Sequence, residues 1–392
     1  MNKKARIIFH IDLNAFYATC AMIKDPYLKD KVFVVGGPGN ARRGVISTAS
    51  YKARAVGVKS GMSLNQALEV YPKLLSVPAD FPLYQKKSRE FINFLKQYSS
   101  LVLQASIDEA YVDMTELAAQ KHPLEIAKEI QDTLVKDYQL PCSIGIAPTL
   151  YLAKMGSDMK KPLGITVLRI RELSKTIWPL SIGSSFGIGK KTAAELNKIG
   201  VFTINDFLEE KNKEKILTKM SLKSYQGHLD EMTGKSSNIV NPDKYAIPQS
   251  ISHETTLNYL IDEPEALVTH LQDLSERVYQ RLKKHNLYYR TVGIKLKFDD
   301  FKSITRSHTF FDFQEDGFLI RSEAEALLEE HYDNKPVRLI GVFISNLITK
   351  EELEKNYDLF NYQKVTKKDD EIEKLIEKIN HKQGKVVKKG IK

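Results

Sequence analysis

The sequence predicts an α+β protein built from several domains, and three observations lead to this expectation. Its 392 residues are enough for two to four domains. In the first half of the chain, short apolar runs of strand length alternate with amphipathic stretches of helix length. From about residue 247 the expected order is strand, helix, strand, strand, helix, strand, which is the split βαβ arrangement.

The composition excludes several classes of protein and favours one class of partner. Hydrophobic residues make up 42% of the chain, and the two cysteines lack the spacing of a disulfide framework or a zinc site. No apolar run could span a bilayer and the N-terminus has no signal-peptide pattern, so we expect a cytoplasmic protein without a membrane partner. The formal net charge of +10 favours a polyanionic partner; a generic basic surface is the alternative.

Three carboxylates are the strongest candidates for chemistry. An apolar strand near the N-terminus ends at Asp12, and Asp108 and Glu109 stand together inside a second strand-like run, 102–114. Side chains alternate between the faces of a regular strand, so a tight turn or bulge is needed for both members of the pair to reach one ion. Carboxylates beside substrate phosphates suit Mg²⁺. The alternative is an exposed hairpin turn, with Asp12 capping a helix that starts near Ala15.

A row of phosphate-binding side chains is expected in the segment after the first strand. A short buried strand, 31–37, is followed by a second strand and a helix that opens near Ser47. On that helix Thr48, Tyr51 and Arg54 would share a face. Hydroxyl groups, a forked guanidinium and the positive end of a helix suit a triphosphate; an ordinary solvated helix face is the alternative.

Helices and strands continue to alternate as far as residue 168. The pattern predicts helices over 124–138 and 150–159 and strands over 142–147 and 165–168. Lys161 could reach a phosphate as a point charge; alternatively, it offsets the dipole at the end of the second helix.

Residues 186–201 have the pattern of a helix-hairpin-helix. A short turn with Gly187 and Gly189 brings backbone N–H groups to the start of a helix, where a DNA phosphate can bind. Lys190 and Lys191 add positive charge at that point. The polar, turn-rich residues that follow, 236–244, indicate a linker.

The last third of the chain is predicted to form a sheet covered by two helices. Strands are expected over 247–257, 289–298, 302–311 and 337–347, and helices over 264–285 and 321–332. The two middle strands carry basic and hydroxyl side chains that suit phosphate tracking; a solvated sheet face is the alternative. These candidate DNA-binding residues are Arg290, Lys295, Lys297, Thr305, Arg306 and Ser307.

A short peptide with an apolar end follows the last predicted strand. Its Leu-Phe pair suits a docking peptide, or a tether that packs on the chain's own surface. The peptide consists of Asn356, Tyr357, Asp358, Leu359 and Phe360. A charged helix over 368–379 and a basic end over 385–392 complete the chain.

Taken in order, five stretches resemble motifs of the Y-family DNA polymerases, most closely those of the bacterial DNA polymerase IV (DinB) branch. The resemblance covers nearly the whole chain, and five matches at the family's spacing argue against chance. The stretches are HIDLNAFY at 10–17, RGVISTASYKAR at 43–54, SIDEAY at 106–111, LAK at 152–154 with KKPLG at 160–164, and the hairpin from RTV at 290–292 to TRS at 305–307.

The resemblance implies a right-hand polymerase. It places a palm at 1–18 and 78–168, small fingers at 19–77, a helix-hairpin-helix thumb at 169–235, a linker at 236–246, a split βαβ little finger at 247–348 and a C-terminal tail at 349–392.

The resemblance also assigns a metal site and a nucleotide site. Asp12, Asp108 and Glu109, with the Leu13 carbonyl, would bind two Mg²⁺ for in-line attack by a primer 3′-OH, with Mn²⁺ as a substitute. The dNTP triphosphate would be held by Thr48, Tyr51, Arg54 and Lys161.

One aromatic residue matches the steric gate of the family. The ring of Tyr17 would lie under the sugar and clash with a ribose 2′-OH, so that ribonucleotides are rejected. Its neighbour Phe16 would pack in the palm or touch the nucleotide.

The family's partners are expected as well. As in the family, small fingers would check base-pair shape poorly, so we expect low-fidelity translesion synthesis on primer–template DNA. The resemblance also implies that synthesis is distributive, and we expect the protein to be a monomer. Its recruitment would come from the sliding clamp, the β subunit of the replicative polymerase. The peptide 356–360 resembles the clamp-binding pentapeptide, with Asn356 where the family usually has the longer Gln.

The sequence departs from the family at two positions near the predicted metal site. Ala21, after Cys20, stands where the family often has Glu, and Asn14 stands where some relatives have Asp. Each departure removes a nearby carboxylate, but neither changes the three principal ligands, so we still expect activity.

Two other functions compete with this one. The chain could be a scaffold that occupies damaged primer ends and recruits the clamp without synthesis; the acidic triad and the triphosphate row favour an enzyme. It could also be a UmuC-like polymerase V subunit that needs accessory proteins. The short region after the little finger and the position of Leu359 and Phe360 favour the polymerase IV branch.

Overall fold

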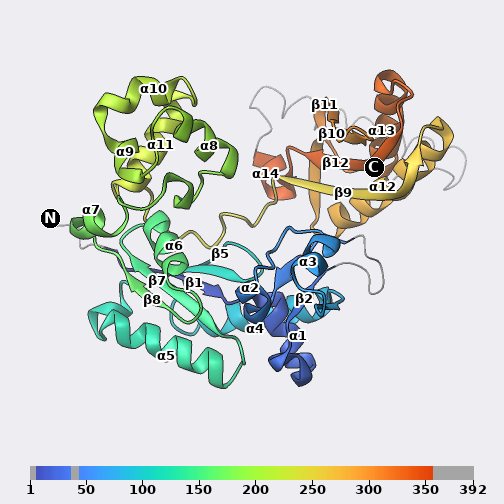
Figure 1. Cartoon of the computed structure of the whole chain (residues 1–392). Coiled ribbons are helices and arrows are strands. Elements are labelled where there is room, and N and C mark those ends of the chain that lie inside the picture. The colour runs from blue at the N-terminus through green and yellow to red at the C-terminus, as the bar shows by residue number, and fades with distance from the viewer. Residues whose placement is uncertain (1–5, 37–43, 356–392) are drawn as a thin grey trace, which may run out of the picture. The chain divides into compact units, whose positions relative to one another are not determined.

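The structure, a computed structural model, describes residues 6–36 and 44–355. The chain divides into two compact units, Met1–Lys244 and Tyr245–Lys392, and the division falls in the segment expected to be a linker. Both units combine helices with strands (Figure 1), as predicted for an α+β chain. None of the helices in the described part is long and apolar enough to cross a membrane.

A five-stranded sheet forms the centre of the N-terminal unit, with the strand order β5-β6-β1-β7-β8. The middle strand β1 is buried along its whole length and pairs antiparallel with β6 and β7. The strands are β1 (Ile8–Leu13), β5 (Val102–Gln104), β6 (Glu109–Asp113), β7 (Cys142–Ala147) and β8 (Ile165–Val167).

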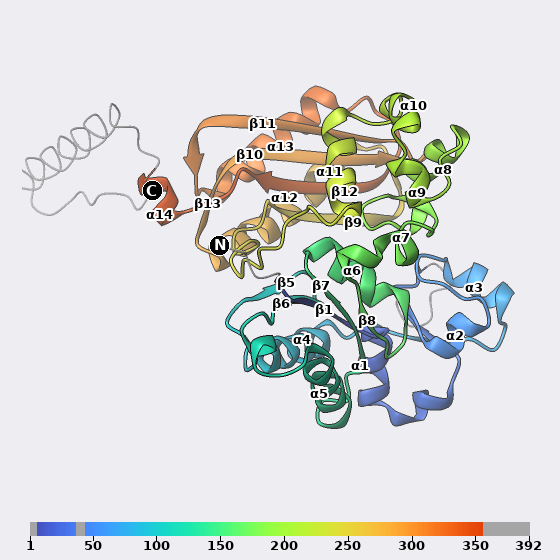
Figure 2. The ribbon, with the colours of Figure 1, turned by 90° about the vertical axis from the view of Figure 1, so that its left-hand side faces the viewer.

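Helices cover both faces of this sheet (Figure 2). α4 (Phe81–Leu95) and α5 (Pro123–Lys136) share a hydrophobic core with one face. α6 (Leu150–Met159) packs on the other face, at the bounds predicted from the sequence.

The alternation of side chains along β1 decides what each face contains. Phe9 and Ile11 join the core beneath α4 and α5. His10 and Asp12 point to the opposite face, where they contact α6. One strand therefore supplies both a core and a polar surface.

α6 lies close to β7 because Gly145 has no side chain. A Cβ at this position would lie 1.9 Å from the carbonyl oxygen of Ala153 and 2.5 Å from the backbone nitrogen of Ser157. Gly156 faces it from the helix, and a Cβ there would lie 3.1 Å from the Cα of Gly145. The absence of side chains at these two glycines therefore allows α6 to pack closely against the sheet.

A smaller three-stranded sheet, in the order β3-β2-β4, lies beside short helices. Its strands are β2 (Phe33–Val35), β3 (Thr48–Ala49) and β4 (Leu75–Val77). The helices of this region are α1 (Phe16–Lys24), α2 (Tyr51–Ala55) and α3 (Leu64–Val70).

The expected helix start near Ser47 is wrong. Thr48 pairs with β2 as part of β3, and α2 begins only at Tyr51. The reason is a helix cap: the hydroxyl of Ser50 accepts a hydrogen bond from the backbone nitrogen of Ala53 at 3.2 Å. Thr48 therefore lies before the helix, not on its first turn.

A helical block completes the N-terminal unit and is built around buried side chains such as Leu196 and Phe207. Its helices are α7 (Leu173–Thr176), α8 (Lys190–Lys198), α9 (Ile204–Leu208), α10 (Lys213–Leu217) and α11 (Leu222–Met232). Single 3₁₀ turns occur in this unit at Pro26–Asp30, Leu117–Ala119, Ile170–Glu172, Ile182–Ser184 and Glu210–Asn212.

The C-terminal unit has the predicted split βαβ order. Its antiparallel sheet, β11-β10-β12-β9, carries both long helices on one face. The elements are β9 (Ser250–Ile261), α12 (Pro264–Lys284), β10 (Leu287–Phe298), β11 (Ser303–Gln314), α13 (Gly317–His331) and β12 (Val337–Ser345), followed by β13 (Ile348–Thr349) and α14 (Lys350–Lys355).

Two local features of this unit were not expected. α13 begins at Gly317 rather than Arg321, because the Asp316 carboxylate accepts a hydrogen bond from the backbone nitrogen of Phe318 at 2.8 Å and caps the helix.

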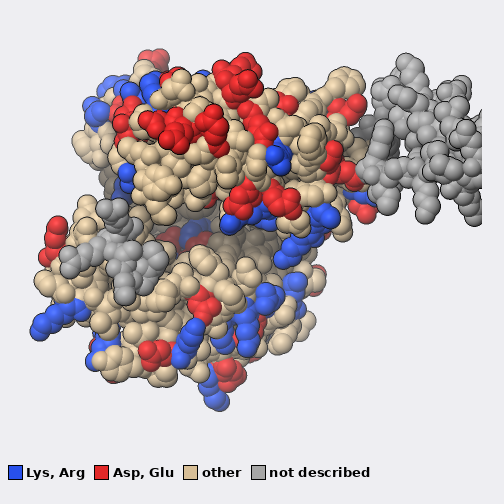
Figure 3. Space-filling model, turned by 90° about the vertical axis from the view of Figure 1, so that its right-hand side faces the viewer, with Lys and Arg blue, Asp and Glu red and all other residues tan. Residues whose placement is uncertain are grey.

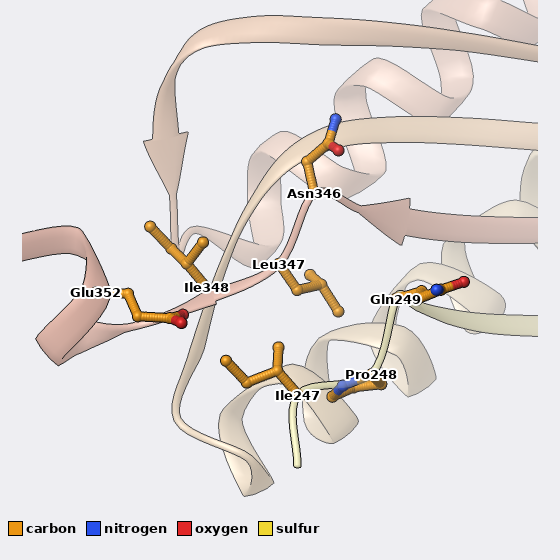
Figure 4. Close-up of a pocket in the computed structure, with 7 residues that line it drawn as sticks. All are labelled: Ile247, Pro248, Gln249, Asn346, Leu347, Ile348 and Glu352. Atoms are coloured by element: carbon orange, nitrogen blue, oxygen red, sulfur yellow. The ribbon is translucent and has the colours of Figure 1, made fainter. Parts of the chain in front are cut away.

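A surface pocket lies where β12 leads into α14 (Figure 4). It is lined by Ile247, Pro248, Gln249, Asn346, Leu347, Ile348 and Glu352, none of them a predicted site residue.

Candidate active site

Three carboxylates meet at one end of the five-stranded sheet. β1 and β6 pair so that Asp12 lies directly opposite Glu109. Asp108 occupies the turn just before β6, and its carbonyl oxygen accepts a hydrogen bond from the backbone nitrogen of Leu13 at 2.9 Å. The tight turn predicted at the Asp-Glu pair is therefore present, and it frees Asp108 from strand alternation.

The carboxylates differ in their partners. The hydroxyl of Ser106 donates to Asp108 at 2.6 Å. Lys154 from α6 reaches Glu109 at 2.5 Å and Asp12 at 3.2 Å. In the described part of the chain, no group of three acidic, histidine or cysteine side chains is arranged to hold a metal ion.

A second lysine joins the cluster from the loop after α6. Lys161 lies 2.8 Å from Asp12 and 2.9 Å from Asp158, and Asp158 also lies 3.2 Å from Lys154. Asp12 is only 6% exposed, whereas Asp158 lies at the surface. The cluster therefore runs from a buried aspartate to an exposed one.

The crowding of these charges shifts their pKa values in opposite directions. Burial, followed by the neighbouring Asp12, raises the pKa of Glu109 to about 7 against the opposing effect of Lys154. Burial also raises the pKa of Asp108. Burial would raise the pKa of Asp12 too, but its hydrogen bond with Glu109 and the charges of Lys161 and Lys154 lower it instead.

His10 lies beneath this cluster of charged side chains. Its ring is fully buried, and its Nδ1 lies 2.7 Å from the hydroxyl of Ser157. Burial and the charge of Lys154 lower the pKa of His10 to about 3, so the ring is neutral. A neutral ring adds no charge to the cluster and fixes the neighbouring turn of α6.

The predicted triphosphate row is split between two elements. Tyr51 and Arg54 lie on α2, three residues apart, whereas Thr48 lies on β3. The hydroxyl of Tyr51 is buried and has no hydrogen-bond partner among the described residues. Arg54 donates from Nε to the carbonyl of Ala49 at 3.0 Å, and its guanidinium carbon lies 4.9 Å from the centre of the Tyr51 ring.

Tyr17 stands at the start of α1 in a cluster of aromatic rings. It stacks on Tyr84 with ring centres 4.2 Å apart and planes 12° apart, and the Phe81 ring meets its edge at 6.3 Å. Tyr17 is half-buried, so one part of its ring is held and another is accessible. Phe16 is only 2% exposed and belongs to the core under the sheet.

The two departures from the family pattern are both accommodated. The Asn14 side chain donates to the Ser143 hydroxyl at 3.0 Å and accepts from the backbone nitrogen of Leu163 at 2.8 Å. An Asp side chain at position 14 could accept the hydrogen bond from Leu163 but could not donate one to Ser143. Ala21 and Cys20 are buried in the core.

Sequence reasoning assigned no role to His10, Lys154, Asp158 or Tyr84. Lys154 and Asp158 are four residues apart on α6, a spacing that favours an ion pair on a helix. This spacing alone could not reveal that Lys154 also reaches Asp12 and Glu109, because that contact depends on how α6 packs on the sheet.

The predicted DNA-binding glycines lie on an exposed turn. Gly187 has a left-handed φ of 90°, and α8 begins directly after Gly189. Gly187, Gly189, Lys190 and Lys191 are all exposed. The turn therefore offers backbone N–H groups and positive charge at one surface.

The predicted basic hairpin does not point all its side chains the same way. Lys295 pairs with Thr305 in the sheet, and Gly293 pairs with Ser307. By alternation, Lys295, Lys297, Thr305 and Ser307 share the sheet face without helices. Lys295 is bound to Glu254 at 2.7 Å on that face.

The remaining basic residues of the hairpin have other surroundings. Arg306 pairs with Ile294, a core residue, so its side chain starts on the helix side of the edge strand. Arg290 lies at an irregularity of β10 and donates to the carbonyl of Phe310 at 3.0 Å.

One helix of the C-terminal unit is rich in acidic side chains. Helix α13 carries Glu323, Glu325, Glu329 and Glu330. Figure 3, which looks onto the helix side of this unit, shows Asp and Glu side chains gathered there. The glutamates of α13 therefore make the helix side of this unit a poor surface for a polyanion. The peptide 356–360 and the helix predicted over 368–379 lie outside the described residues.

Both parts of the chain match one protein family. Residues 11–158 match the impB/mucB/samB family, and residues 248–358 match its C-terminal domain. The chain is 39% identical to DNA polymerase IV 1 of Bacillus subtilis (strain 168), covering 100% of this chain and 94% of the relative. It is 37% identical to DNA polymerase IV of Clostridium perfringens (strain 13 / Type A), covering 91% of this chain and 100% of the relative.

Solved structures with the same fold belong to the same class. A Y-family DNA polymerase chimera of Dbh and Dpo4 is 26% identical, with a TM-score of 0.80 over 88% of this chain and 100% of the chimera. An insertion ternary complex of Dbh DNA polymerase has a TM-score of 0.65 with the same coverage and identity.

The fold and these matches define the class as the Y-family DNA polymerases. The chain belongs to the impB/mucB/samB family of that class, in the branch of bacterial DNA polymerase IV.

Proposed function

We propose that the chain is a template-directed translesion DNA polymerase that adds dNTPs to a primer 3′-OH in an Mg²⁺-dependent reaction. The observation that carries this proposal is the register of β1 and β6, which puts Asp12 beside Glu109 with Asp108 in the adjoining turn. DNA-directed DNA polymerase activity agrees with the family to which the chain belongs.

The oxygen chemistry of the donor set suits Mg²⁺, although in this structure the carboxylates are not arranged to hold an ion and Lys154 contacts two of them. Asp12, Asp108 and Glu109 offer hard carboxylate oxygens. Burial, with a smaller contribution from the nearby Asp12, raises the pKa of Asp108 and Glu109, and a divalent cation would stabilise their charged forms. The Leu13 carbonyl would complete the set. Two Mg²⁺, or Mn²⁺ in their place, would supply activation of the primer 3′-OH and neutralisation of the leaving pyrophosphate.

The nucleotide would lie over α1 and α2. The unpartnered hydroxyl of Tyr51 and the donors of Arg54, Thr48 and Lys161 suit triphosphate oxygens. Tyr17 would act as the steric gate, because its stacking on Tyr84 fixes the ring and prevents it from yielding to a 2′-OH.

Primer–template DNA would contact both units through its phosphates. The exposed turn at Gly187 and Gly189 with Lys190 and Lys191 suits one backbone, and the uncovered sheet face with Lys295, Lys297, Thr305 and Ser307 suits another. We place Arg290 and Arg306 at the edge of that contact.

We propose that synthesis is distributive and of low fidelity, and that the monomeric enzyme is recruited by the sliding clamp. Small fingers, built from three short strands and three short helices, leave little surface to check base-pair shape. The peptide 356–360 would bind the clamp, with Asn356 giving a weaker contact than Gln.

The first test is primer extension by the purified chain with Mg²⁺ and four dNTPs on undamaged, abasic and N2-guanine-adducted templates. We expect short products from the wild type and a loss of at least about 10³-fold in rate for Asp108→Ala, because removal of a metal ligand leaves charge unneutralised in the transition state. Extension that survives in Asp108→Ala would show that the chemistry lies elsewhere. A wild type that binds primer ends without extending them would favour a scaffold, and extension only with added proteins would favour the polymerase V-like alternative.

A further inference from the structure

Lys154 occupies the position of a cation within the acidic cluster. Its ammonium group lies 2.5 Å from Oε1 of Glu109, 3.2 Å from Oδ2 of Asp12 and 3.2 Å from Oδ2 of Asp158. The residue is 8% exposed. A single buried positive charge thus contacts two of the three carboxylates proposed as metal ligands.

We propose that Lys154 is a positioning residue that holds Asp12 and Glu109 as an internal counter-ion, and that Mg²⁺ binds only by displacing it from their oxygens. The residue would thereby set the Mg²⁺ concentration that the site requires. This inference rests on the proposed function, because it takes Asp12, Asp108 and Glu109 as the metal ligands.

Electrostatics favour a cation between Asp12 and Glu109. Two carboxylates buried side by side repel each other and lose hydration, so each needs a cation nearby. Lys154 meets that need from α6, which the glycine pair Gly145 and Gly156 brings close to the sheet. The ammonium group and Mg²⁺ are both positive and repel each other when they share the same two carboxylates, so the two cations compete.

The displaced ammonium group of Lys154 has another partner. Asp158 is four residues further along α6, contacts Lys154 already and lies at the surface. A modest rotation of the Lys154 side chain toward Asp158 would keep its charge paired. Release of Asp12 and Glu109 therefore does not leave an unpaired buried cation.

Lys161 is less suited to this role. Its side chain is 26% exposed compared with 10% for Lys154, and its ion pairs are with Asp12 and Asp158, whereas Glu109 pairs with Lys154. It also belongs to the proposed triphosphate site. Lys154 is the group that bridges the two proposed ligands.

The test compares Mg²⁺ binding, rather than synthesis, in the full chain with and without the Lys154 charge. Thermal unfolding is followed during an Mg²⁺ titration, and Mn²⁺ binding is measured by electron paramagnetic resonance. In Lys154→Met we expect half-maximal stabilisation at about tenfold lower Mg²⁺ than in the wild type, because the competing charge has been removed. Without divalent ions this variant should unfold at a lower temperature.

Three further variants make the result specific. Lys154→Gln also removes the charge but keeps a hydrogen-bond donor, and it should bind Mg²⁺ more tightly than the wild type. This second uncharged variant keeps the test valid if Lys154→Met fails to fold. Lys154→Arg keeps the charge and should resemble the wild type. Lys87→Met removes another sparingly exposed lysine, paired with Glu90 at 2.8 Å, and should leave Mg²⁺ binding unchanged.

The inference is overturned if Lys154→Met and Lys154→Gln bind Mg²⁺ with wild-type or weaker affinity, since Lys154 would then support the ligands and not compete for them. Failure of the metal site itself looks different. In that case the wild type gains no stability from Mg²⁺, or Asp108→Ala gains as much as the wild type.

Discussion

At the scale of single residues, Glu109 has two opposing influences on it. Burial and Asp12 favour its protonated form, whereas Lys154 favours its charged form, and the first influence prevails. A carboxyl group with a pKa of about 7 is charged only in part at neutral pH. Its ability to bind a cation should therefore change within the physiological range.

This gives a pH prediction for the metal site. A carboxyl group must lose its proton to coordinate Mg²⁺, so affinity should be highest above pH 7 and fall below it, by about tenfold for each pH unit if one proton is released. The Mg²⁺ titration of thermal stability at pH 6, 7 and 8 measures this. In Glu109→Gln the decline between pH 8 and pH 6 should be much smaller; an equal decline would assign the proton to another group.

Tyr17 gives a second prediction at this scale. Tyr17→Ala should admit ribonucleotides and raise the ratio of rNTP to dNTP incorporation by about 10²-fold or more, because the ring that clashes with the 2′-OH is gone. Single-nucleotide insertion kinetics with matched rNTP and dNTP measure the ratio. Tyr17→Phe keeps the stacked ring and should retain the selection, whereas unchanged selection in Tyr17→Ala would place the gate on another residue.

At the scale of elements, the packing of α6 on the sheet decides which side chains meet the carboxylates. The helix presents Lys154 and Asp158 on one turn and Ser157 beneath them. Its distance from β7 is fixed at Gly145, where a side chain would overlap the helix backbone. The glycine at the contact between α6 and β7 thus helps to position Lys154 and Asp158 near the carboxylates.

Replacement of this glycine tests the packing. Gly145→Ala should destabilise the chain by roughly 3 kcal/mol or somewhat more, because overpacking against backbone cannot be relieved by a side-chain rotation. Chemical denaturation measures the loss, and polymerase activity should fall with it as α6 moves away.

Gly227 is the matched control. It lies within helix α11 and a Cβ there would meet nothing within 4 Å. Gly227→Ala should be neutral or stabilising by up to about 1 kcal/mol. Equal stability of Gly145→Ala and the wild type would mean that α6 can shift freely on the sheet.

At the scale of the whole molecule, the two units have separate hydrophobic cores. Each carries basic side chains, which are exposed at Lys190 and Lys191 and half-buried at Lys295 and Lys297. Such an arrangement suits a long polyanion that contacts several surfaces weakly. Weak, dispersed contacts favour short extension events, so recruitment by a clamp would have a large effect on product length.

The docking peptide is tested at this scale. Replacing Leu359 and Phe360 by Ala should abolish clamp-stimulated synthesis, since these apolar side chains would fill the clamp pocket, and leave extension without clamp unchanged. Asn356→Gln should strengthen the stimulation by restoring the longer amide. Full stimulation of the double variant would place the clamp contact elsewhere on the chain.

The sequence by itself determined the local structure and the order of elements. Apolar periodicity predicted the strands ending at Asp12 and spanning 142–147, helix 150–159, and the split βαβ order, because each depends on neighbours within a few residues. It also predicted a turn or bulge at the acidic pair, where the structure has Asp108 in a turn and Glu109 at the first position of β6. Its errors were at helix starts, where the Ser50 and Asp316 caps decide the first residue, and at the ends of β9, which was expected over 247–257 and runs over Ser250–Ile261.

Only the tertiary structure decided which distant side chains share a surface. The contact of Lys154 with Asp12 and Glu109 needs both a strand register and the height of a helix, neither of which a local pattern contains. The direction of Arg306, away from the face of Lys295, likewise follows from pairing between strands. Contacts between residues far apart in the chain depend on packing, and packing is a property of the whole fold.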